Sequence, residues 1–228
     1  MHLPKACLFD LDGVLLNTEH LHGQAWKEAA SEFDINLTDQ QLMLLRGRRR
    51  IDCINQIIHW SKRRVITEDF LKVHQPISRK LLLNASPMPG AKSLIEHCVS
   101  AEIPIALVTS SSSSSLDLKT ASHLWIKNIK TKVLGDDLEL NKGKPAPDPF
   151  LLAAKKLQVS PKECWALEDS ESGSQSALAA GCQVWILTDN QNGSIFPDKK
   201  LDIDSNPKYI NKIDYFYKAL NKEDSLKL

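Results

Sequence analysis

Two aspartates that follow a short apolar run are the strongest candidates for chemistry in this sequence. Asp10 and Asp12 lie in the segment FDLDGV, residues 9–14, and at the end of a strand two residues spaced in this way point to the same side. Two negative charges at close range are costly unless a cation lies between them. Carboxylate oxygens are hard ligands that suit Mg²⁺, and Gly13 lets the backbone pass close to a ligand. The spacing therefore indicates a magnesium site.

Three further groups of chemically useful side chains come just after predicted strands. They are Thr109, Lys144 within the segment GKPAPD, and the acid pair Glu168-Asp169. An isolated pair of aspartates is usually solvated, and these additional groups argue against that interpretation here. A hydroxyl, a cation, an acid pair and the first two aspartates together supply a nucleophile, a proton donor, a metal site and charge neutralisation. Phosphoryl transfer needs this combination.

Alternating strand and helix patterns must position these side chains. Short apolar runs predict strands at 6–9, 103–108, 131–134, 165–167 and 184–187. Helical spacing predicts helices at 91–100, 116–124, 148–157 and 174–180. This alternation is typical of a parallel sheet covered on both faces. The serine run 110–115 is expected to be a loop at the carboxyl end of that sheet, where open α/β folds bind ligands.

A block of helices interrupts this pattern after the first strand. Helical spacing extends from about residue 18 to 33, a short helix ends at Leu45, a third apolar face begins near Ile51, and a fourth helix spans about 67–83. The segment PMPG, residues 87–90, then marks a clear break. We therefore predict an α/β fold with a Rossmann-like parallel-sheet core, residues 1–15 and 87–228, and an inserted all-helical domain, residues 16–86. One late strand near Tyr209 and a final helix are expected in the polar tail after Asp189.

Composition excludes several classes of protein. Of 228 residues, 42% are hydrophobic and 25% are charged, which is ordinary for a globular protein and excludes a disordered chain, a collagen or a membrane-spanning protein. The net charge of +1 argues against a dedicated nucleic-acid-binding protein. The five cysteines are odd in number and form no C-x-x-C motif, which suits a reducing cytosol. We expect a cytoplasmic protein with neither a nucleic-acid nor a membrane partner.

The motifs FDLDGV, KPAPD and ALEDS, in that order over about residues 5–187, resemble those of the haloacid dehalogenase superfamily. The resemblance is nearest to the branch that contains β-phosphoglucomutase and small sugar-phosphate phosphatases. It implies that Asp10 is the nucleophile that becomes an aspartyl phosphate. It implies that Asp12 protonates the leaving oxygen and then activates water. The helical insertion would be a mobile cap over the site.

The same resemblance implies roles for the remaining motif residues. Thr109 and the backbone of Ser110 would hold the transferring phosphate, and Lys144 would neutralise charge on Asp10 and on that phosphate. Mg²⁺ would bind to Asp169, to Asp10 and to the carbonyl oxygen of Asp12. Glu168 would be a further ligand or would lie behind the ligands.

The insertion carries two candidate substrate contacts. His22 and Trp26 match an H-x-x-x-W pattern that resembles the mutase and several phosphatases, although core packing explains Trp26 equally well. The segment LRGRRR, residues 45–50, resembles the substrate loop of the mutase at Arg46, Gly47 and Arg50, and departs from it at Arg49, where a serine is expected. Because cations are disfavoured at a helix N-terminus, an anionic partner is expected for one or two arginines; the alternative is a solvated helix start.

The resulting hypothesis is a Mg²⁺-dependent phosphatase, a phosphoric monoester hydrolase acting on a small phosphorylated metabolite, with a sugar phosphate favoured. A sugar phosphomutase is the second hypothesis, since both reactions use the same aspartyl phosphate. A catalytically silent binding or regulatory protein on the same fold is the third, and the intact Asp10, Asp12, Lys144 and Asp169 argue against it. Dehalogenation is disfavoured because Asp12 and the acid pair suit phosphoryl chemistry.

Overall fold

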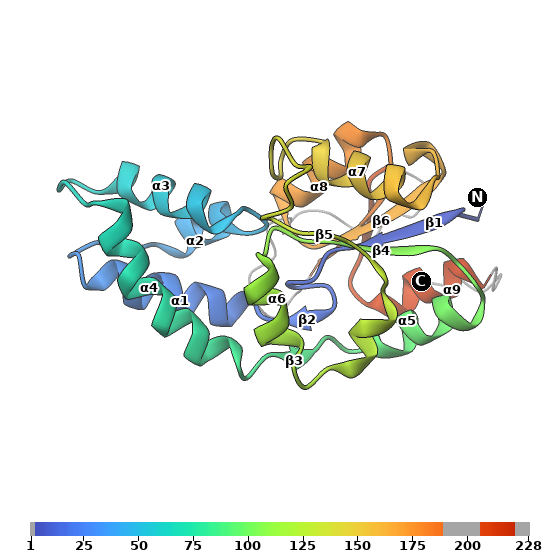
Figure 1. The fold of residues 1–228 in the computed structure, drawn as a ribbon, viewed down its shortest axis with the longest axis horizontal. Helices are drawn as coiled ribbons and strands as arrows, with labels where there is room; N and C mark the ends of the chain where they lie inside the picture. Colours follow the sequence, from blue (N-terminus) through green and yellow to red (C-terminus); the bar gives the residue numbers. More distant parts are fainter. Residues whose placement is uncertain (1–2, 189–205, 222–228) are drawn as a thin grey trace.

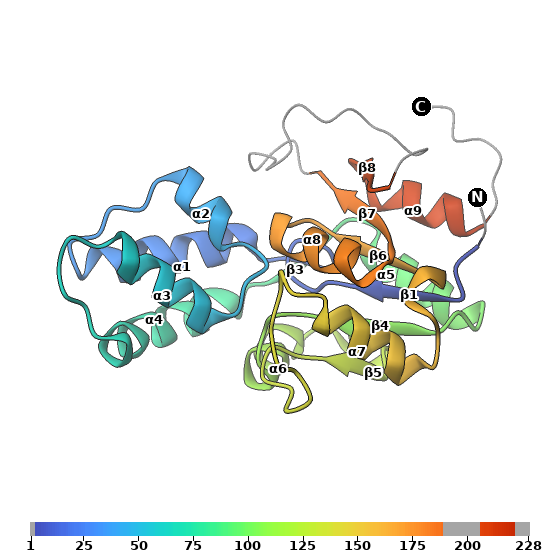
Figure 2. The same ribbon diagram turned by 90° about the horizontal axis from the view of Figure 1, so that it is seen from above.

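A six-stranded parallel sheet forms the centre of the larger part of the protein (Figures 1 and 2). The computed structural model describes residues 3–188 and 206–221. The strands lie in the order β5-β4-β1-β6-β7-β8, and every neighbouring pair is parallel. Their bounds are β1 Ala6–Phe9, β4 Ile105–Val108, β5 Thr131–Val133, β6 Cys164–Glu168, β7 Gln183–Leu187 and β8 Lys208–Ile210. The predicted α/β fold with a Rossmann-like sheet is confirmed.

Helices cover both faces of this sheet, which makes three layers (Figure 1). One face is covered by α7, Asp148–Leu157, and α8, Glu171–Ala180. The other carries α5, Ala91–Ser100, with α6, Ser113–Thr120, and α9, Ile213–Leu220. A separate hydrophobic cluster lies on each face. Because the central strands are buried on both faces, their sequences are continuous apolar runs rather than alternating ones.

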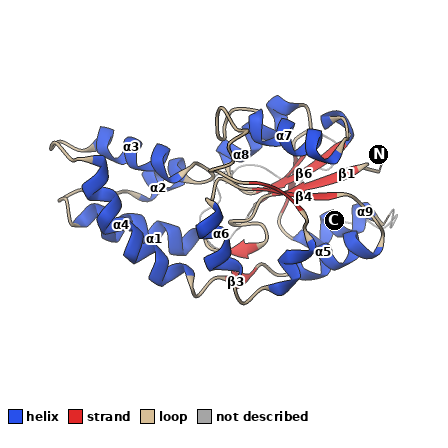
Figure 3. Ribbon diagram, viewed as in Figure 1, coloured by secondary structure: helices blue, strands red, loops and turns tan. Residues whose placement is uncertain are grey.

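Four helices form the second part of the protein, drawn apart from the sheet in Figure 3. They are α1 Glu19–Ser31, α2 Asp39–Leu45, α3 Arg50–Trp60 and α4 Thr67–Leu82. Their own hydrophobic cluster includes Trp26, Ile54, Ile57 and Phe70. A short antiparallel pair, β2 Leu16–Asn17 and β3 Ser86–Pro87, joins the two ends of this helical part. The strands lie at the ends of the insertion predicted over 16–86; the division of the chain into domains at those residues stays a prediction.

The serine run differs from its predicted loop conformation. Helix α6 begins at Ser113, because the side chain of Ser112 accepts a hydrogen bond from the backbone N–H of Ser115 and caps the helix. The helix ends at Thr120 rather than continuing to Leu124, and a short 3₁₀ turn, Leu124–Asn128, follows it. A second 3₁₀ turn, Pro161–Glu163, precedes β6.

The elements near the carboxyl end of the described chain match the expectation of a late strand and a final helix, β8 and α9. No helix within residues 3–188 and 206–221 has both the length and the apolar character needed to span a membrane.

Candidate active site

Strand register brings the predicted site residues to one edge of the sheet. Phe9 of β1 is paired with Leu107 of β4 on one side and with Leu167 of β6 on the other. The backbone N–H of Asp10 donates to the carbonyl of Leu167 at 3.1 Å, so Asp10 continues the strand alignment. Thr109 and Asp169 directly follow β4 and β6. The carboxyl ends of three adjacent strands therefore present these side chains together.

Lys144, in the loop between β5 and α7, contacts two of the acidic side chains and a carbonyl of the sheet. Its ammonium group donates to Asp10 Oδ1 at 2.6 Å, to Glu168 Oε1 at 2.5 Å and to the carbonyl of Val108 at 2.9 Å. All three charged side chains are almost fully buried. Burial alone would lower the pKa of Lys144, but Asp10 and Glu168 outweigh it and raise that pKa above its ordinary value. Lys144 is therefore held as a cation beside the candidate nucleophile.

An acidic cluster beside this lysine has the composition of a metal site. Asp10, Glu168 and Asp169 each place a carboxylate oxygen within 4.8 Å of the others. Burial raises the pKa of Asp10 to about 8; Lys144 opposes the rise, and Glu168 and Asp12 add to it. Burial, together with Glu19 and Asp10, raises the pKa of Asp169 well above its ordinary value. One lysine does not compensate this much buried negative charge, and hard oxygen donors fit Mg²⁺.

Two glycines allow the backbone to approach this cluster. Gly13 has a φ of +81°, and a Cβ at that position would lie 2.0 Å from Asp169 Oδ2. A Cβ on Gly173, in the first turn of α8, would lie 2.1 Å from Glu168 Oε2. Glu168 is already engaged, because Oε1 accepts from Lys144 and Oε2 accepts from the hydroxyl of Ser170 at 3.1 Å. This geometry favours the placement of Glu168 behind the ligands, with Asp10 and Asp169 as the carboxylates in front.

Asp12 is surrounded by four donors. Lys119 Nζ lies 2.6 Å from each of its carboxylate oxygens, and Thr18 Oγ1 lies 2.5 Å from Oδ1. Ser111 Oγ donates to Oδ2 at 3.0 Å, and His22 Nε2 lies 3.1 Å from Oδ1. Burial alone would raise the pKa of Asp12, but Lys119 and His22 outweigh it and hold that pKa well below its ordinary value. Asp12 is therefore a carboxylate that protein groups orient before any substrate arrives.

Several of these residues were missed by the sequence analysis. Thr18, Ser111, Lys119 and Glu19 belong to no motif that it used. One local signal existed for Lys119. It follows Leu116 by three positions, so the two residues share a helix face, and a lysine on the apolar face of a predicted helix is unusual unless it is paired.

The loop 46–49 of the helical part contacts the sheet part directly. Ser110 Oγ donates to the carbonyl of Gly47 at 2.7 Å. Gly47 has a φ of +72°, and a Cβ there would lie 2.1 Å from Ser170 Oγ. A Cβ on Gly143, next to Lys144, would lie 2.7 Å from Arg49 Nε. Ser110 was predicted to hold phosphate through its backbone; the structure adds a hydroxyl contact to the helical part, and the phosphate role stays a prediction.

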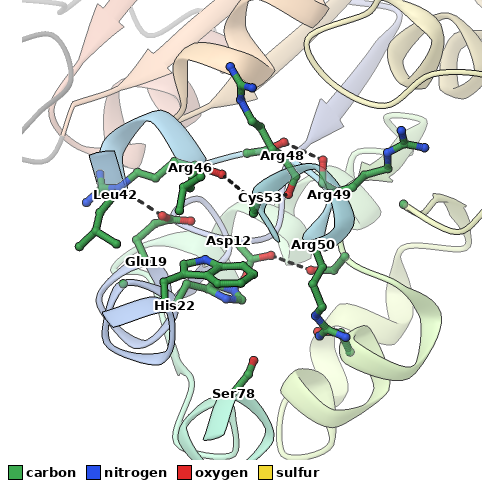
Figure 4. Close-up of a pocket in the computed structure, with 18 of the residues that line it drawn as sticks. Asp12, Glu19, His22, Leu42, Arg46, Arg48, Arg49, Arg50, Cys53 and Ser78 are labelled. Atoms are coloured by element: carbon green, nitrogen blue, oxygen red, sulfur yellow. Dashed lines mark hydrogen bonds and ion pairs between the residues drawn. The ribbon is translucent and has the colours of Figure 1, made fainter. Parts of the chain in front are cut away.

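The arginines of this loop have different surroundings. Arg46 Nε lies 3.2 Å from Glu19 Oε2, and a dashed line marks this ion pair in Figure 4. Arg49 Nε donates to Asp52 Oδ2 at 2.9 Å. Arg50, the first residue of α3, is half-buried and lines the cavity. The arginines thus do not form a uniform solvated face.

A cavity of about 600 Å³ lies between the two parts of the protein. Residues of both parts line it, among them Asp10, Asp12, His22, Arg50 and Thr109. Trp26 also lines it but is only 7% exposed and belongs to the hydrophobic cluster of the helices. The Trp26 ring stacks on the ring of His74 with centroids 3.7 Å apart. Both interpretations of Trp26, packing and substrate contact, are therefore compatible with its place.

Comparison with known proteins agrees with this geometry. A family model of haloacid dehalogenase-like hydrolases matches residues 4–181. The probable pseudouridine-5'-phosphatase of Drosophila melanogaster is 33% identical over 187 residues, which are 80% of this chain and 81% of that protein. Hexitol phosphatase A of Escherichia coli is 31% identical over 180 residues, 79% of this chain and 81% of that protein.

Solved structures show the same fold. The crystal structure of a HAD hydrolase of family IA, variant 3, from Entamoeba histolytica has a TM-score of 0.72 and 27% identity, and covers 95% of this chain and 97% of its own. The β-phosphoglucomutase of Clostridium difficile has a TM-score of 0.74 at 23% identity, with 97% and 99% covered. The named sequence relatives above are phosphatases, in agreement with the predicted class of phosphoric monoester hydrolases. This chain belongs to the haloacid dehalogenase-like hydrolase family.

Proposed function

We propose that this protein is a Mg²⁺-dependent phosphatase that hydrolyses a small phosphorylated metabolite, with a sugar phosphate as the favoured class, through an aspartyl phosphate on Asp10. The observation that carries the proposal is the position of Asp10. It lies between the buried cation Lys144 and a cluster of acids, with the oriented carboxylate of Asp12 two residues away. The relatives named as phosphatases of pseudouridine 5'-phosphate and hexitol phosphates support the size of the substrate.

The reaction divides into two displacements at phosphorus. In the first, a carboxylate oxygen of Asp10 forms a bond to phosphorus while the bond to the leaving oxygen breaks, and Asp12 gives that oxygen a proton, which Asp12 must first take up because the free protein holds it as a carboxylate. In the second, Asp12 takes a proton from water as the water oxygen attacks the aspartyl phosphate, which releases inorganic phosphate and restores Asp10.

The remaining residues stabilise charge and orientation. Lys144 holds Asp10 in place and offsets negative charge on the transferring group, and Thr109 and the Ser110 backbone bind its oxygens. Asp10, Asp169 and the carbonyl of Asp12 would hold the metal, and Glu168 would fix Lys144 behind them. Bound Mg²⁺ supplies charge neutralisation for the transferring phosphoryl group.

The phosphomutase hypothesis receives no specific support from the arginine loop. Arg49 occupies the position where the mutase pattern has a serine, and its guanidinium pairs with Asp52. The similarity to β-phosphoglucomutase structures at 23% identity concerns the fold.

A phosphate-release assay with a panel of phosphorylated metabolites and Mg²⁺ tests the proposal. Asp10→Asn is nearly isosteric but cannot attack phosphorus, so we expect it to abolish turnover. Asp117→Asn is the matched control, because it makes the same chemical change at an exposed aspartate of α6. An Asp10→Asn variant that turns over its substrate at the wild-type rate would exclude the covalent mechanism. Conversion of a hexose 1-phosphate into its 6-phosphate, activated by a bisphosphate and without phosphate release, would show a mutase. No reaction with any ester would favour the binding protein.

A further inference from the structure

Two buried side chains of α4 have polar atoms without partners. His74 is 1% exposed and Ser78 is 2% exposed. Within the described chain, neither ring nitrogen of His74 forms a hydrogen bond, and Ser78 Oγ neither donates nor accepts one. The two residues are four positions apart, so they share one face of the helix. Buried polar groups in folded proteins are normally hydrogen-bonded, so a neighbouring pair without partners needs an explanation.

Both side chains line the cavity that contains Asp10 and Asp12. Figure 4 shows Ser78 pointing from α4 into this space. The Trp26 ring fixes the His74 ring by stacking at an interplanar angle of 11°. Arg50 and His22 line the same cavity. The unpartnered atoms therefore belong to a wall of the candidate active site rather than to a sealed core.

The position of this wall relative to the chemistry follows from helix α1. His22 lies 3.1 Å from Asp12, and Trp26, one helical turn farther along, stacks on His74. A helix advances about 5.4 Å per turn. His74 thus lies about one helical turn beyond the carboxylate that acts on the leaving oxygen. Helix α4 runs back toward the sheet part, antiparallel to α1 (Figure 1), so Ser78, four positions after His74, lies nearer to the level of His22. A leaving group must extend past its first carbon atoms to reach His74.

We propose that His74 and Ser78 form a subsite for the uncharged, hydroxyl-bearing far end of a pentose- or hexose-sized leaving group. The inference rests on the proposed phosphatase function and adds the part of the protein that recognises the rest of the substrate. Burial, with Arg50 and His22, lowers the pKa of His74 to about 3, so its imidazole is neutral. A neutral imidazole offers one donor and one acceptor, and a serine hydroxyl offers both.

This donor and acceptor pattern selects hydroxyl groups over a second phosphate. A phosphate dianion only accepts hydrogen bonds, so it would leave the acceptor nitrogen of His74 unsatisfied. A sugar or polyol hydroxyl donates and accepts, and it satisfies both residues. Burying an unsatisfied polar group is costly. The subsite therefore favours a hydroxyl over a phosphate, because a phosphate would leave a buried nitrogen of His74 without a hydrogen bond.

The test compares two phosphate esters of equal chain length, sorbitol 6-phosphate and n-hexyl phosphate, which lacks the hydroxyls. Ser78→Ala removes one hydrogen-bonding group, and His74→Phe keeps an aromatic ring against Trp26 while removing both nitrogens. We expect kcat/KM on sorbitol 6-phosphate to fall roughly 3- to 10-fold in each variant, mostly through KM, the range for loss of one uncharged hydrogen bond. The loss on hexyl phosphate should be clearly smaller. Gln75→Ala, at an exposed position of the same helix, is the matched control.

Thermal unfolding separates binding from a structural role. Ser78→Ala removes a buried hydroxyl that has no partner in the free protein, so its melting temperature should stay equal to or exceed that of the wild type. Unchanged or raised stability with selective loss on sorbitol 6-phosphate supports the subsite. Equal losses on both esters, or lowered stability without selectivity, overturn it. Faster wild-type turnover of glycerol 3-phosphate than of sorbitol 6-phosphate also overturns it and leaves the phosphatase proposal intact. Absence of phosphate release from every ester, phenyl phosphate included, is the separate failure of the proposed function.

Discussion

Lys119 and Asp12, 107 positions apart in the chain, form a two-pronged ion pair in which one ammonium nitrogen lies 2.6 Å from both carboxylate oxygens. The lysine side chain is fully buried and its carboxylate partner is 15% exposed. The same nitrogen donates to Ser111 Oγ at 2.7 Å, and Ser111 in turn donates to Asp12. A buried lysine on α6 thus sets the orientation of the residue to which we assign proton transfer.

Replacement of this lysine should affect turnover more than substrate binding. Lys119→Met keeps the length of the side chain but removes the charge, and Asp12 loses its largest stabilising partner. Because proton transfer contributes about 10²–10⁴-fold to such reactions, we expect kcat to fall by about 10²-fold with little change in KM. Steady-state kinetics on the best substrate measure this, and Lys127→Met, at an exposed lysine, is the control. A variant with wild-type kcat would show that Thr18, Ser111 and His22 are sufficient to orient Asp12.

Mg²⁺ should stabilise the fold as well as support activity. A ligand at 100 times its dissociation constant adds about 2.7 kcal/mol, which is about 5–10 °C of melting temperature for a chain of this size. Asp169→Asn should abolish most of this response, and it should raise the stability of the metal-free protein because one like charge beside Asp10 and Glu168 is removed. Calorimetry with Mg²⁺ and with a chelator measures both effects. An Asp169→Asn protein that responds to Mg²⁺ like the wild type would contradict the assigned ligand.

The metal response should also depend on pH. Burial raises the pKa of Asp10 to about 8, with Glu168 and Asp12 adding to it, so the metal-free folded protein binds a proton that the unfolded chain, at pH 6–8, does not. The stability this gives is present below the ordinary aspartate pKa of about 4 and is lost as pH rises through about 8. Mg²⁺ must displace that proton, so the rise in melting temperature should be larger at pH 8 than at pH 6.

Ca²⁺ should support less activity than Mg²⁺, because its longer and more numerous bonds would misplace Asp10.

Arg50→Ala should weaken binding of substrates that reach into the helical part. Burial lowers the pKa of Arg50, and within the described chain its guanidinium forms no ion pair, so a substrate oxygen is a suitable partner. Loss of a hydrogen bond from a charged group costs about 1.5–3 kcal/mol, and we expect it mainly in KM. The same variant assayed on p-nitrophenyl phosphate should lose much less. Equal losses on both substrates would mean that Arg50 supports the fold or the phosphate site, and no loss on either would return it to a solvated helix start.

His74 should make the stability of the protein sensitive to acid. Burial, assisted by Arg50 and His22, lowers its pKa to about 3, whereas the unfolded chain has an ordinary histidine pKa of about 6.5. The contribution of neutral His74 to the unfolding free energy is complete above pH 6.5. It is lost as pH falls toward 3, by up to about 1.4 kcal/mol per pH unit. Urea unfolding at several pH values should therefore show that His74→Phe has a shallower loss of unfolding free energy between pH 6.5 and 4.5. Parallel curves would mean that His74 has the same pKa in the folded and the unfolded protein.

The strands were predictable from the sequence because their burial on both faces leaves an unmistakable pattern. Residues 6–9 and 148–157 form a strand and a helix with the predicted bounds. The serine run was not predictable in this way, because identical polar residues carry no periodicity. Only the capping bond between Ser112 and Ser115 shows where α6 begins.

The site was predictable to the extent that its residues lie in motifs. Asp10 and Lys144 are 134 positions apart, and their placement after predicted strands, together with the family resemblance, linked them before the structure did. Lys119 has no such motif, and its contact with Asp12 depends on how α6 lies beside the loop that follows β1. The partnership of Trp26 with His74 likewise results from the packing of α1 on α4, which the spacing of either helix alone does not define.

The contact between Ser110 and Gly47 has a consequence for how firmly the helical part is held against the sheet part. One neutral hydrogen bond, 2.7 Å long, is worth about 0.5–1.5 kcal/mol, which corresponds to a closed-to-open population ratio of roughly 2 to 12 from this bond alone. A contact of that strength is broken by thermal motion, so if the helical part is the mobile cap that the family resemblance implies, this bond alone would not hold it shut against product release. It is also weak enough for the binding energy of a well-fitting substrate to outweigh it.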